Sequence, residues 1–372
     1  MGSVDFDVVI IGGGVVGLAC AVHASTRARS VLLLERNARF GEETSTRNSG
    51  VIHAGLYYPT GSLKARACVA GRELLYARCE RHGVEHRRCG KLLVATQDSE
   101  RARLQELQTL GLANGAGELV MLEAAELARL EPNVRAEAAL LSPQTGIVDA
   151  HGLMDSYRAD ARDAGAELLP RTEVTGIVRE GAQFRVETRA SDGATHTIAC
   201  ARVVNAAGLA SDRIARMAGV DTAAAGLSLH YCKGDYFALS PSLGALCSHL
   251  VYPVPAQAGL GIHVTLDLGG QLSAGPDVEY VDEIDYAIDP DKVGDFARAV
   301  ARYLPQVRAE HLTPNYAGIR PKLQGPGQGF RDFVIEDAAP HGVPGLINLI
   351  GIESPGLTAS EALALEVAAL LD

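Results

Sequence analysis

The chain opens with a short apolar run, a glycine-rich turn and a longer apolar segment. Val8–Ile11 is rich in β-branched residues and too short for a helix, which indicates a strand that ends in the glycines at 12–14. Residues 18–22 continue as a helix, and residues 30–34 (SVLLL) form a second apolar run. This order predicts a strand, a helix and a parallel second strand, and the rest of the chain is organised around this unit.

Helical periodicity and capping residues predict further helices. Ser62 and Gly83 have the residue types that begin and end helices, as do Asp149 and Gly165. The predicted helices are 63–81, one capped by Ser99 that carries Leu104, Leu107 and Leu110, 124–130, 151–164, 291–304 and a C-terminal helix after Pro355 and Gly356. The predicted strands are 92–95, 173–179, 183–189, 195–199, 203–204 and 346–350, with a hairpin turn at 191–193.

From residue 227 to 276 the pattern changes to short strands separated by turns, with no helix. The strand-like runs are HYCKGDYFAL (230–239), HLVYPVP (249–255), GIHVTLDL (261–268) and GQLSAGP (270–276). In GIHVTLDL the apolar residues alternate with polar ones, so a period of two places His263 on the polar face, opposite the packed one. We therefore predict an antiparallel sheet in a second domain.

Length and composition narrow the class of protein. A chain of 372 residues exceeds the usual single-core limit of roughly 250–300 residues, which favours two domains. The net charge of −11 and the pI near 5.5 disfavour nucleic acid as a partner. The seven cysteines form no C-x-x-C pair, so neither a disulfide framework nor a metal site is indicated. Without an apolar leader or a membrane-length apolar run, a cytoplasmic protein is expected.

The glycine-rich turn carries the first chemical signal. Gly12, Gly14 and Gly17 complete G-x-G-x-x-G between a strand and a helix. Gly12 permits the tight turn, Gly14 lets a pyrophosphate approach the backbone, and Gly17 allows close packing of helix and strand. Glu35 lies 21 residues after Gly14, near the spacing of about 20 expected for a carboxylate that binds ribose hydroxyls. The motif predicts dinucleotide binding, and alone it does not separate NAD from FAD.

Beyond this motif the chain resembles the D-amino-acid oxidase superfamily of FAD enzymes. The segment NSGVIHAGLYYPTGSLKARACVAG closely resembles the L-2-hydroxyglutarate dehydrogenase family within it. Further similar stretches are CGKLLVA (89–95), TGIVDAHGL (145–153), VVNAAGLASDRIARMAG (203–219), KGDYF (233–237), YPVP (252–255), GIHVT (261–265) and AGIRP (317–321). The resemblance therefore extends over nearly the whole chain.

The resemblance implies a fold and a cofactor. The fold class is α/β (α+β overall), with a Rossmann-like FAD-binding domain and a second domain built on the antiparallel sheet. The predicted FAD-binding domain comprises 1–88, 145–226 and 318–372, and the substrate domain comprises 89–144 and 227–317. The residues expected to bind FAD are Gly12, Gly14, Val15, Val16, Gly17, Glu35, Arg36, Thr44, Ser45, Thr46, Asn48, Ser49, Gly50, Val51, Val174, Ala207, Gly208, Gly318, Arg320, Ser354, Pro355, Gly356, Leu357 and Thr358.

The expected reaction is oxidation of an L-2-hydroxy acid, most simply L-2-hydroxyglutarate, by hydride transfer to FAD. It needs a base for the hydroxyl proton, and His53 and His263 are both candidates. Arg320 is expected to bind the carboxylate, and Lys233 is the candidate for the second carboxylate. Tyr58 and Tyr252 are expected to line the pocket.

Other readings stay open at this point. An amine or amino-acid oxidase acting on glycine, sarcosine or a D-amino acid, or a glycerol-3-phosphate-type dehydrogenase, would share the fold, and a flavin-binding accessory protein would lack activity. Covalent attachment of FAD through His53 is a further hypothesis, which acid precipitation tests.

The electron acceptor is expected to be a quinone or O2. A quinone would bring the protein to a membrane surface, at the periphery of the inner membrane. The oligomeric state is not indicated.

Overall fold

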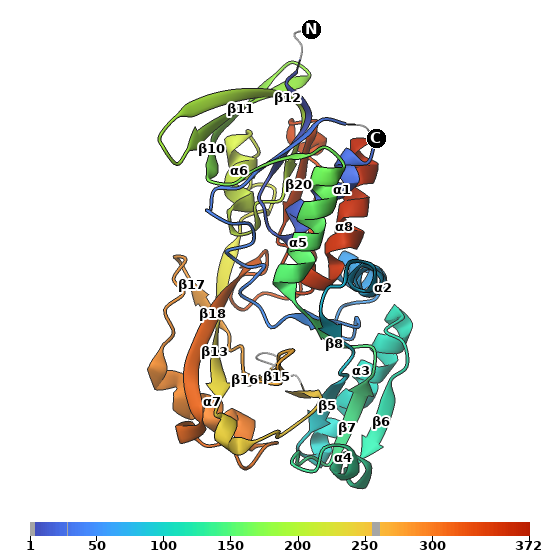
Figure 1. Cartoon of the computed structure of the whole chain (residues 1–372). Helices are drawn as coiled ribbons and strands as arrows, with labels where there is room; N and C mark the ends of the chain where they lie inside the picture. Colours follow the sequence, from blue (N-terminus) through green and yellow to red (C-terminus); the bar gives the residue numbers. More distant parts are fainter. Residues whose placement is uncertain (1–3, 28, 255–260) are drawn as a thin grey trace.

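The computed structural model describes residues 4–27, 29–254 and 261–372, and the end of the predicted strand 249–255 (Pro255) lies outside them. Two sheets dominate the fold, one in each half of the molecule (Figure 1). The C-terminus lies at the end of the molecule that holds the first sheet (Figure 1). The long strands β13 and β18 extend from the middle of the molecule into the second half (Figure 1). A binding site can therefore form in the region between the two sheets.

The first sheet has eight strands and a parallel centre. Its order is β10-β11-β12-β1-β2-β9, with β20 beside β12 and β19 beside β20. The strands are β1 (Phe6–Ile11), β2 (Val31–Leu34), β9 (Glu167–Leu169), β10 (Thr172–Glu180), β11 (Gln183–Ala190), β12 (Thr195–Asn205), β19 (Val334–Asp337) and β20 (Leu346–Ile350). The central pairs are parallel. Their continuous apolar runs follow from burial on both faces.

Helices cover this sheet. They are α1 (Val15–Ser25), α5 (Ala150–Asp163), α6 (Ser211–Met217) and α8 (Gly356–Leu371), and α2 (Leu63–His82) packs against α8. Figure 1 shows α1, α5 and α8 side by side on one face, and α6 on the other. The buried apolar face of α1 packs between α5 and α8, which fixes its N-terminus at the end of β1.

The second sheet has nine strands in the order β17-β13-β16-β15-β14-β5-β7-β6, with β18 beside β13. Its strands are β5 (Lys91–Ala95), β6 (Val120–Glu123), β7 (Ala138–Ser142), β13 (His230–Leu239), β14 (Leu250–Pro253), β15 (Val264–Leu266), β16 (Leu272–Ala274), β17 (Glu279–Val281) and β18 (Leu312–Lys322). Its helices are α3 (Arg101–Asn114), α4 (Ala124–Leu130) and α7 (Val293–Ala301). A small sheet of β3 (Val51–Ile52), β8 (Gly146–Val148) and β4 (His86–Arg87) completes the fold.

The predicted fold class, with its α/β dinucleotide-binding architecture and its second sheet, is confirmed. The second sheet is antiparallel except for the parallel pair β5–β14, which joins strands about 160 residues apart in the sequence. The predicted runs 195–199 and 203–204 form one continuous strand, β12, whose first half pairs with β11 and whose second half pairs with β1. The division into two domains with the boundaries given above stays a prediction.

The predicted helix ends illustrate local capping. The Ser62 side chain accepts a hydrogen bond from the backbone N–H of Ala65, and Gly83 ends α2 in the left-handed conformation. Asp149 caps α5 through the N–H of His151. The prediction for Ser99 was wrong: a 3-10 turn over Asp98–Glu100 precedes α3, with Gln97 at its N-cap, because Glu100 folds back onto the N–H groups of Thr96 and Gln97.

The polar face predicted for His263 is not a solvent face. His263 lies just before β15 and is buried, as is Thr265, while Val264 and Leu266 pack in the apolar core. The period of two separated the two faces of this segment correctly, but at His263 the polar face borders the cavity described below and not solvent.

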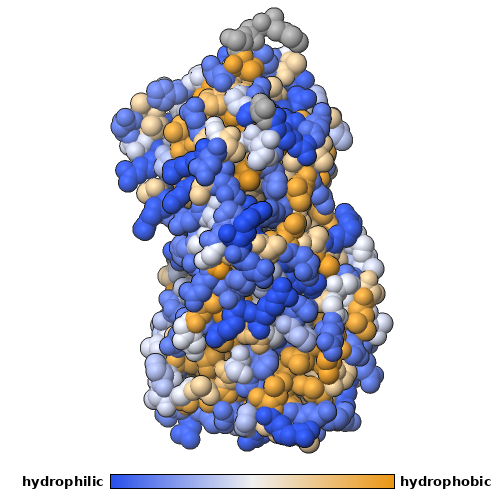
Figure 2. Space-filling model, turned by 45° about the vertical axis from the view of Figure 1, so that its right-hand side comes forward, coloured by the Kyte–Doolittle hydropathy of each residue, from blue (hydrophilic) through white to orange (hydrophobic). Residues whose placement is uncertain are grey.

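Polar residues dominate the face of the molecule in Figure 2, with apolar ones interspersed among them. Within the described ranges, no helix combines the length and apolar character that crossing a membrane requires.

Candidate active site

A cavity of about 450 Å³ lies between the two sheets. It runs from Glu35 and Val174, past the start of α1, to His53, Tyr252 and His263. The volume falls in the range of small-molecule sites, about 300–1,000 Å³. The cavity therefore joins the end of the chain that carries the glycine motif to the end that carries the candidate bases.

The glycine turn forms the wall of the cavity at the start of α1. Gly12 has φ +107°, and a Cβ there would collide with the carbonyl of Ala206. Gly14 is the N-cap of α1 and supplies no side-chain hydrogen bond. Ser45 Oγ accepts from the N–H of Val15, and the helix start is open at the N–H groups of Val16 and Gly17, which have no side-chain acceptor among the described residues. Gly17 does not line the cavity, because it packs against the carbonyl of Gly12. Its absence from the lining agrees with a packing role.

Glu35 is buried at the end of β2 and lines the cavity. Its Oε2 accepts from the N–H of Gly13 at 2.7 Å, and its Oε1 accepts from the N–H of Asn37 at 2.7 Å. Burial raises the pKa of this carboxyl and these two N–H groups oppose the rise. Each oxygen keeps a lone pair free for a ribose hydroxyl. Arg36, which follows, also lines the cavity and pairs with Glu43.

The polar segment after β2 is held by its own side chains. Asn48 Nδ2 donates to the carbonyls of Thr44 and Ser45 at 3.1 and 2.8 Å, and its Oδ1 accepts from Gly50. Ser45 Oγ accepts from the N–H of Val15, the first residue of α1. The cavity-lining residues of this segment include Thr44, Ser45, Asn48, Ser49 and Val51, whereas Thr46 and Gly50 do not reach the cavity. The segment therefore forms a fixed polar wall beside the helix start.

The opposite wall comes from the start of α8. Ser354, Pro355, Gly356 and Leu357 line the cavity, and the N-cap supplies no side-chain hydrogen bond. Thr358 does not line it. Its Oγ1 accepts from the N–H of His53 at 2.9 Å and donates to the carbonyl of Val51, so it ties the segment that carries His53 to α8.

The remaining predicted cofactor residues lie along the same cavity. Val174 sits at a β-bulge of β10, and Val15, Val16, Ala207, Gly208 and Gly318 also line it. A Cβ at Gly318 would collide with the carbonyl of Arg47, so this glycine lets β18 approach the polar segment.

His53 lies where the polar segment meets α8. Its Nε2 is 3.3 Å from Ser354 Oγ, and its Nδ1 is buried with no hydrogen-bond partner among the described residues. Burial, reinforced by the charge of Lys91, lowers the pKa of His53 to about 3. The imidazole is therefore neutral at neutral pH, and the same shift makes it a weaker base than an ordinary histidine.

His263 stacks on the ring of Tyr252 with the ring centroids 3.6 Å apart. Both residues line the cavity, as do Tyr57 and Tyr58. Burial raises the pKa of Tyr57, Tyr58 and Tyr252 well above the ordinary value, so their hydroxyls stay protonated and can donate hydrogen bonds. The Tyr58 hydroxyl lies 3.5 Å from Ser354 Oγ.

Arg320 lines the cavity from β18, but Lys233 does not. Arg320 Nε donates to the carbonyl of Cys232, and its Nη2 donates to those of Lys233 and Asp277 at 2.9 and 2.7 Å. The Lys233 ammonium donates to the carbonyl of Ala287, away from the cavity. Because side chains alternate along β13, Gly234 faces the cavity and Lys233 cannot. The expectation that Lys233 binds substrate is therefore corrected.

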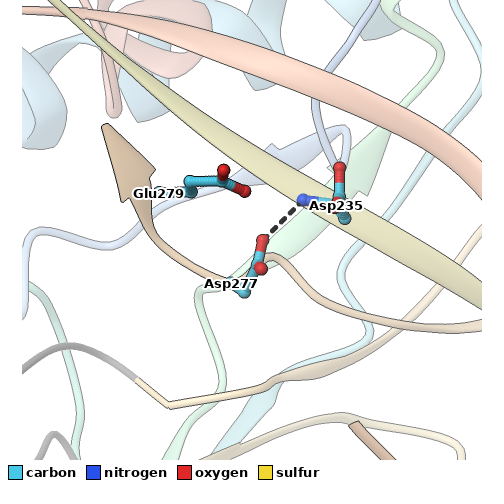
Figure 3. A group of neighbouring side chains, drawn as sticks. All are labelled: Asp235, Asp277 and Glu279. Atoms are coloured by element: carbon cyan, nitrogen blue, oxygen red, sulfur yellow. Dashed lines mark hydrogen bonds between the residues drawn. The ribbon is translucent and has the colours of Figure 1, made fainter. Parts of the chain in front are cut away.

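A charged network supports the strand segment behind Arg320. Asp235, Asp277 and Glu279 point toward one another, and Asp277 Oδ1 accepts from the N–H of Asp235 at 2.7 Å (Figure 3). The ammonium of Lys292 donates to all three carboxylates at 2.6–2.9 Å. Burial alone would lower the pKa of Lys292, but these three bonds outweigh it and raise the pKa. Lys292 is therefore the cation that joins all three carboxylates, and the Lys233 ammonium lies 3.8 Å from Asp235 Oδ1 as a second, more distant partner.

Replacing Lys292 with methionine is expected to destabilise the protein by about 3 kcal/mol, because it leaves three carboxylates together, one of them fully buried. Urea unfolding of the cofactor-loaded protein measures this. Lys292→Arg keeps the charge and should recover most of the loss. An unchanged free energy of unfolding in Lys292→Met would show that the network contributes nothing to stability.

Several charged residues of the site were not predicted from the sequence. Lys64, Lys322 and Glu353 line the cavity, as does Arg47, whose Nε is buried without a partner among the described residues. Lys91 is fully buried beneath the rings of Tyr57 and Tyr252, and burial lowers its pKa to about 7. Lys91 lies in the apolar run CGKLLVA, and nothing in that run indicates that the lysine is buried with it.

Comparison with known proteins places these features in context. A family described as FAD-dependent oxidoreductase matches residues 7–370. The mitochondrial L-2-hydroxyglutarate dehydrogenase of Arabidopsis thaliana is 43% identical, over 97% of this chain and 82% of the plant protein. The L-2-hydroxyglutarate dehydrogenase of Salmonella houtenae is 32% identical, over 88% of this chain and 85% of that protein.

Solved structures agree in fold. The FAD-bound, dithionite-reduced L-α-glycerophosphate oxidase of Mycoplasma pneumoniae superposes with a TM-score of 0.88 at 27% identity, covering 98% of this chain and 94% of that one. Glycine oxidase of Geobacillus kaustophilus superposes with a TM-score of 0.79 at 23% identity, covering 99% and 95%. The second likeness concerns the fold alone.

Proposed function

The chain belongs to the family of FAD-dependent oxidoreductases, in its L-2-hydroxyglutarate dehydrogenase branch, and we propose that it oxidises L-2-hydroxyglutarate to 2-oxoglutarate. The observation that carries this proposal is the 43% identity to the plant dehydrogenase over 97% of the chain. The predicted family and the cofactor, FAD, are confirmed.

The cavity suits FAD. The open start of α1 at Gly14 offers backbone N–H groups to the pyrophosphate, and Glu35 offers carboxylate oxygens to the ribose. The unpartnered Arg47 Nε is a further donor buried at this cavity. The start of α8 at Gly356 would face the electron-rich edge of the flavin ring. We propose that these residues hold the cofactor, together with the polar segment around Ser45 and Asn48.

FAD supplies the hydride acceptor when it is bound. The residues of this chain would orient the hydroxy acid and take up its hydroxyl proton. We propose His53 as the base, since it lines the cavity and its Nε2 contacts Ser354 Oγ at the start of α8. His263 stays the alternative, and its stacking on Tyr252 fits it equally well to shape the pocket. Protonated Tyr58 and Tyr252 are proposed to donate to the substrate oxygens.

Arg320 is the proposed partner of the carboxylate beside the hydroxyl. Its Nε and Nη2 are used by three backbone carbonyls, which fix the plane of the guanidinium. No hydrogen bond of Nη1 is found within the described part of the chain, so its two N–H groups are available to a carboxylate.

A second candidate function is oxidation of a glycerol phosphate. The high superposition on L-α-glycerophosphate oxidase favours it, and that reaction also oxidises a secondary alcohol. The identity of 27% is lower than that to the plant dehydrogenase, so we rank it second.

The test is anaerobic bleaching of the flavin absorbance. We expect rapid bleaching by L-2-hydroxyglutarate, and none of comparable rate by the D-isomer, L-lactate, glycine or glycerol 3-phosphate. Bleaching by glycerol 3-phosphate alone would establish the second candidate, and bleaching by glycine alone would indicate an amine oxidase. No bleaching by any of them would contradict both proposals.

We propose a quinone or O2 as the electron acceptor. A quinone would require contact with a membrane surface, and comparing flavin reoxidation by vesicle-borne ubiquinone with reoxidation by air separates the two acceptors.

A further inference from the structure

One wall of the cavity carries a row of positive charge. Strand β18 presents Gly318, Arg320 and Lys322 at alternate positions, and all three line the cavity because residues two apart share a face. Lys64, in the first turn of α2, lines the same cavity. Two elements far apart in the sequence thus bring three cations to one site.

Lys64 and Lys322 meet on a single carboxylate oxygen. Glu353 Oε1 accepts from Lys64 Nζ at 2.9 Å and from Lys322 Nζ at 2.7 Å. Burial acts to raise the pKa of Glu353, but the two lysines outweigh it and the pKa is lowered, so Glu353 is ionised. The three side chains therefore carry a net charge of about +1. Each ammonium has three donors, and one of them is used on Glu353.

Asp332 lies next to this group but forms no ion pair with either lysine among the described residues. The carboxylate of Asp332 accepts from the backbone N–H groups of Leu63 and Lys64 at 2.6 and 2.9 Å, which makes it a cap of α2. The Lys64 ammonium instead lies over the rings of Phe330 and Phe333, 5.3 and 5.1 Å from their centroids. Both rings accept a cation without neutralising it.

The backbone positions of Arg320 and Lys322 on β18 are spaced on the same scale as the two carboxylates of a small diacid. Residues two apart on a strand are separated by about 7 Å, the distance expected between the backbones of Arg320 and Lys322. In a five-carbon diacid the terminal carbons are joined by four C–C bonds of about 1.5 Å, which span about 5 Å. Glu353 also directly precedes Ser354, whose Oγ contacts His53 Nε2. The cationic trio, formed by Lys64, Lys322 and Glu353, thus lies next to the proposed reacting centre.

We propose that Lys64 and Lys322, bridged by Glu353, bind the second carboxylate of a dicarboxylic substrate and so determine specificity for it. This inference rests on the proposed function, and it gives the task first expected of Lys233 to residues that face the cavity. Glu353 holds the two ammonium groups together and limits their net charge, which matches the single charge of one carboxylate.

A purely structural role for the trio predicts different behaviour. If the ions only stabilise the start of α2 against α8, loss of either lysine would affect all substrates alike. If they bind the second carboxylate, the loss would affect only substrates that have one. The ratio of kcat/KM for a dicarboxylate to that for its monocarboxylate isostere separates the two roles.

The experiment compares L-2-hydroxyglutarate with L-2-hydroxypentanoate, which has the same chain length and a methyl group in place of the second carboxylate. The variants are Lys64→Met and Lys322→Met, each of which leaves Glu353 one lysine partner. Arg66→Met is the matched control, since Arg66 is exposed on the same helix outside the cavity. We expect the ratio to fall about 10- to 100-fold in both lysine variants, the range for losing a hydrogen bond to a charged group, and to stay unchanged in the control.

Binding of the products supplies a readout without turnover. The dissociation constants of 2-oxoglutarate and 2-oxopentanoate are measured from the change in flavin absorbance, and only the first should rise in the lysine variants. Equal losses for both compounds, or no loss for either, would overturn the inference. If L-2-hydroxyglutarate fails to bleach the wild-type flavin, the proposed function fails. The inference then stands only if 2-oxoglutarate still binds more tightly than 2-oxopentanoate, and through these lysines.

Discussion

Replacing His53 with asparagine is expected to lower the rate of flavin reduction by L-2-hydroxyglutarate by about 10²- to 10⁴-fold, the usual contribution of a general base. The asparagine side chain is similar in size and keeps a polar group near Ser354, but it cannot accept the hydroxyl proton. The backbone N–H of residue 53 would still donate to Thr358 Oγ1, so the segment should keep its place beside α8. Stopped-flow reduction at saturating substrate measures the effect on the chemical step.

The pH dependence checks the same assignment independently. Burial and then Lys91 lower the pKa of His53 to about 3, and a base is active only when unprotonated. Lowering the pH from about 8 to about 5 should therefore not protonate His53, whereas an ordinary histidine would lose activity near pH 6.5. His263→Asn is the matched comparison. A larger loss in His263→Asn than in His53→Asn, or an acid limb near pH 6.5 that is absent from His263→Asn, would transfer the role to His263.

Local signals were sufficient for much of the fold. The run Val8–Ile11, the glycines after it and the apolar strand before Glu35 each determine their own conformation through short-range sterics and capping, so β1, α1 and β2 could be predicted from residues near in sequence. Ser62 and Gly83 bounded α2 for the same reason. In each case the atoms that decide the structure lie within a few residues of one another.

Local signals could not predict which strands pair when the strands are far apart in the sequence. Nothing near Lys91 or Leu250 in the sequence indicates that their strands pair in parallel. The cationic trio likewise depends on contacts between α2, β18 and the start of α8, which are separated by hundreds of residues. Lys233 was misplaced because the alternation along β13 was not applied to it. Its neighbour Gly234 holds the cavity face.

The glycine motif supplies the second large expected effect, and the three glycines differ in what they test. Gly12 needs a positive φ, and Gly17 packs on the carbonyl of Gly12, so a side chain at either would disturb the fold itself. Gly14 has φ −75° and ψ 178°, which any residue adopts. A Cβ there meets only the flexible end of Ser45, with Oγ at 2.9 Å. Position 14 can therefore separate cofactor binding from folding.

We expect Gly14→Val to weaken FAD binding at least about a hundredfold, or about 2.8 kcal/mol, while the apoprotein still folds. The branched side chain would displace Ser45 from the N–H of Val15 and cover the open helix start where the pyrophosphate is proposed to lie. The ratio of flavin to protein absorbance after purification, and FAD titration of the apoprotein, measure binding, and circular dichroism measures folding. Gly329→Ala is the control, because Gly329 is exposed with nothing within 4 Å of an added Cβ. Wild-type flavin content in Gly14→Val would mean that the phosphates do not bind at the start of α1, and loss of secondary structure would mean that the position serves the fold.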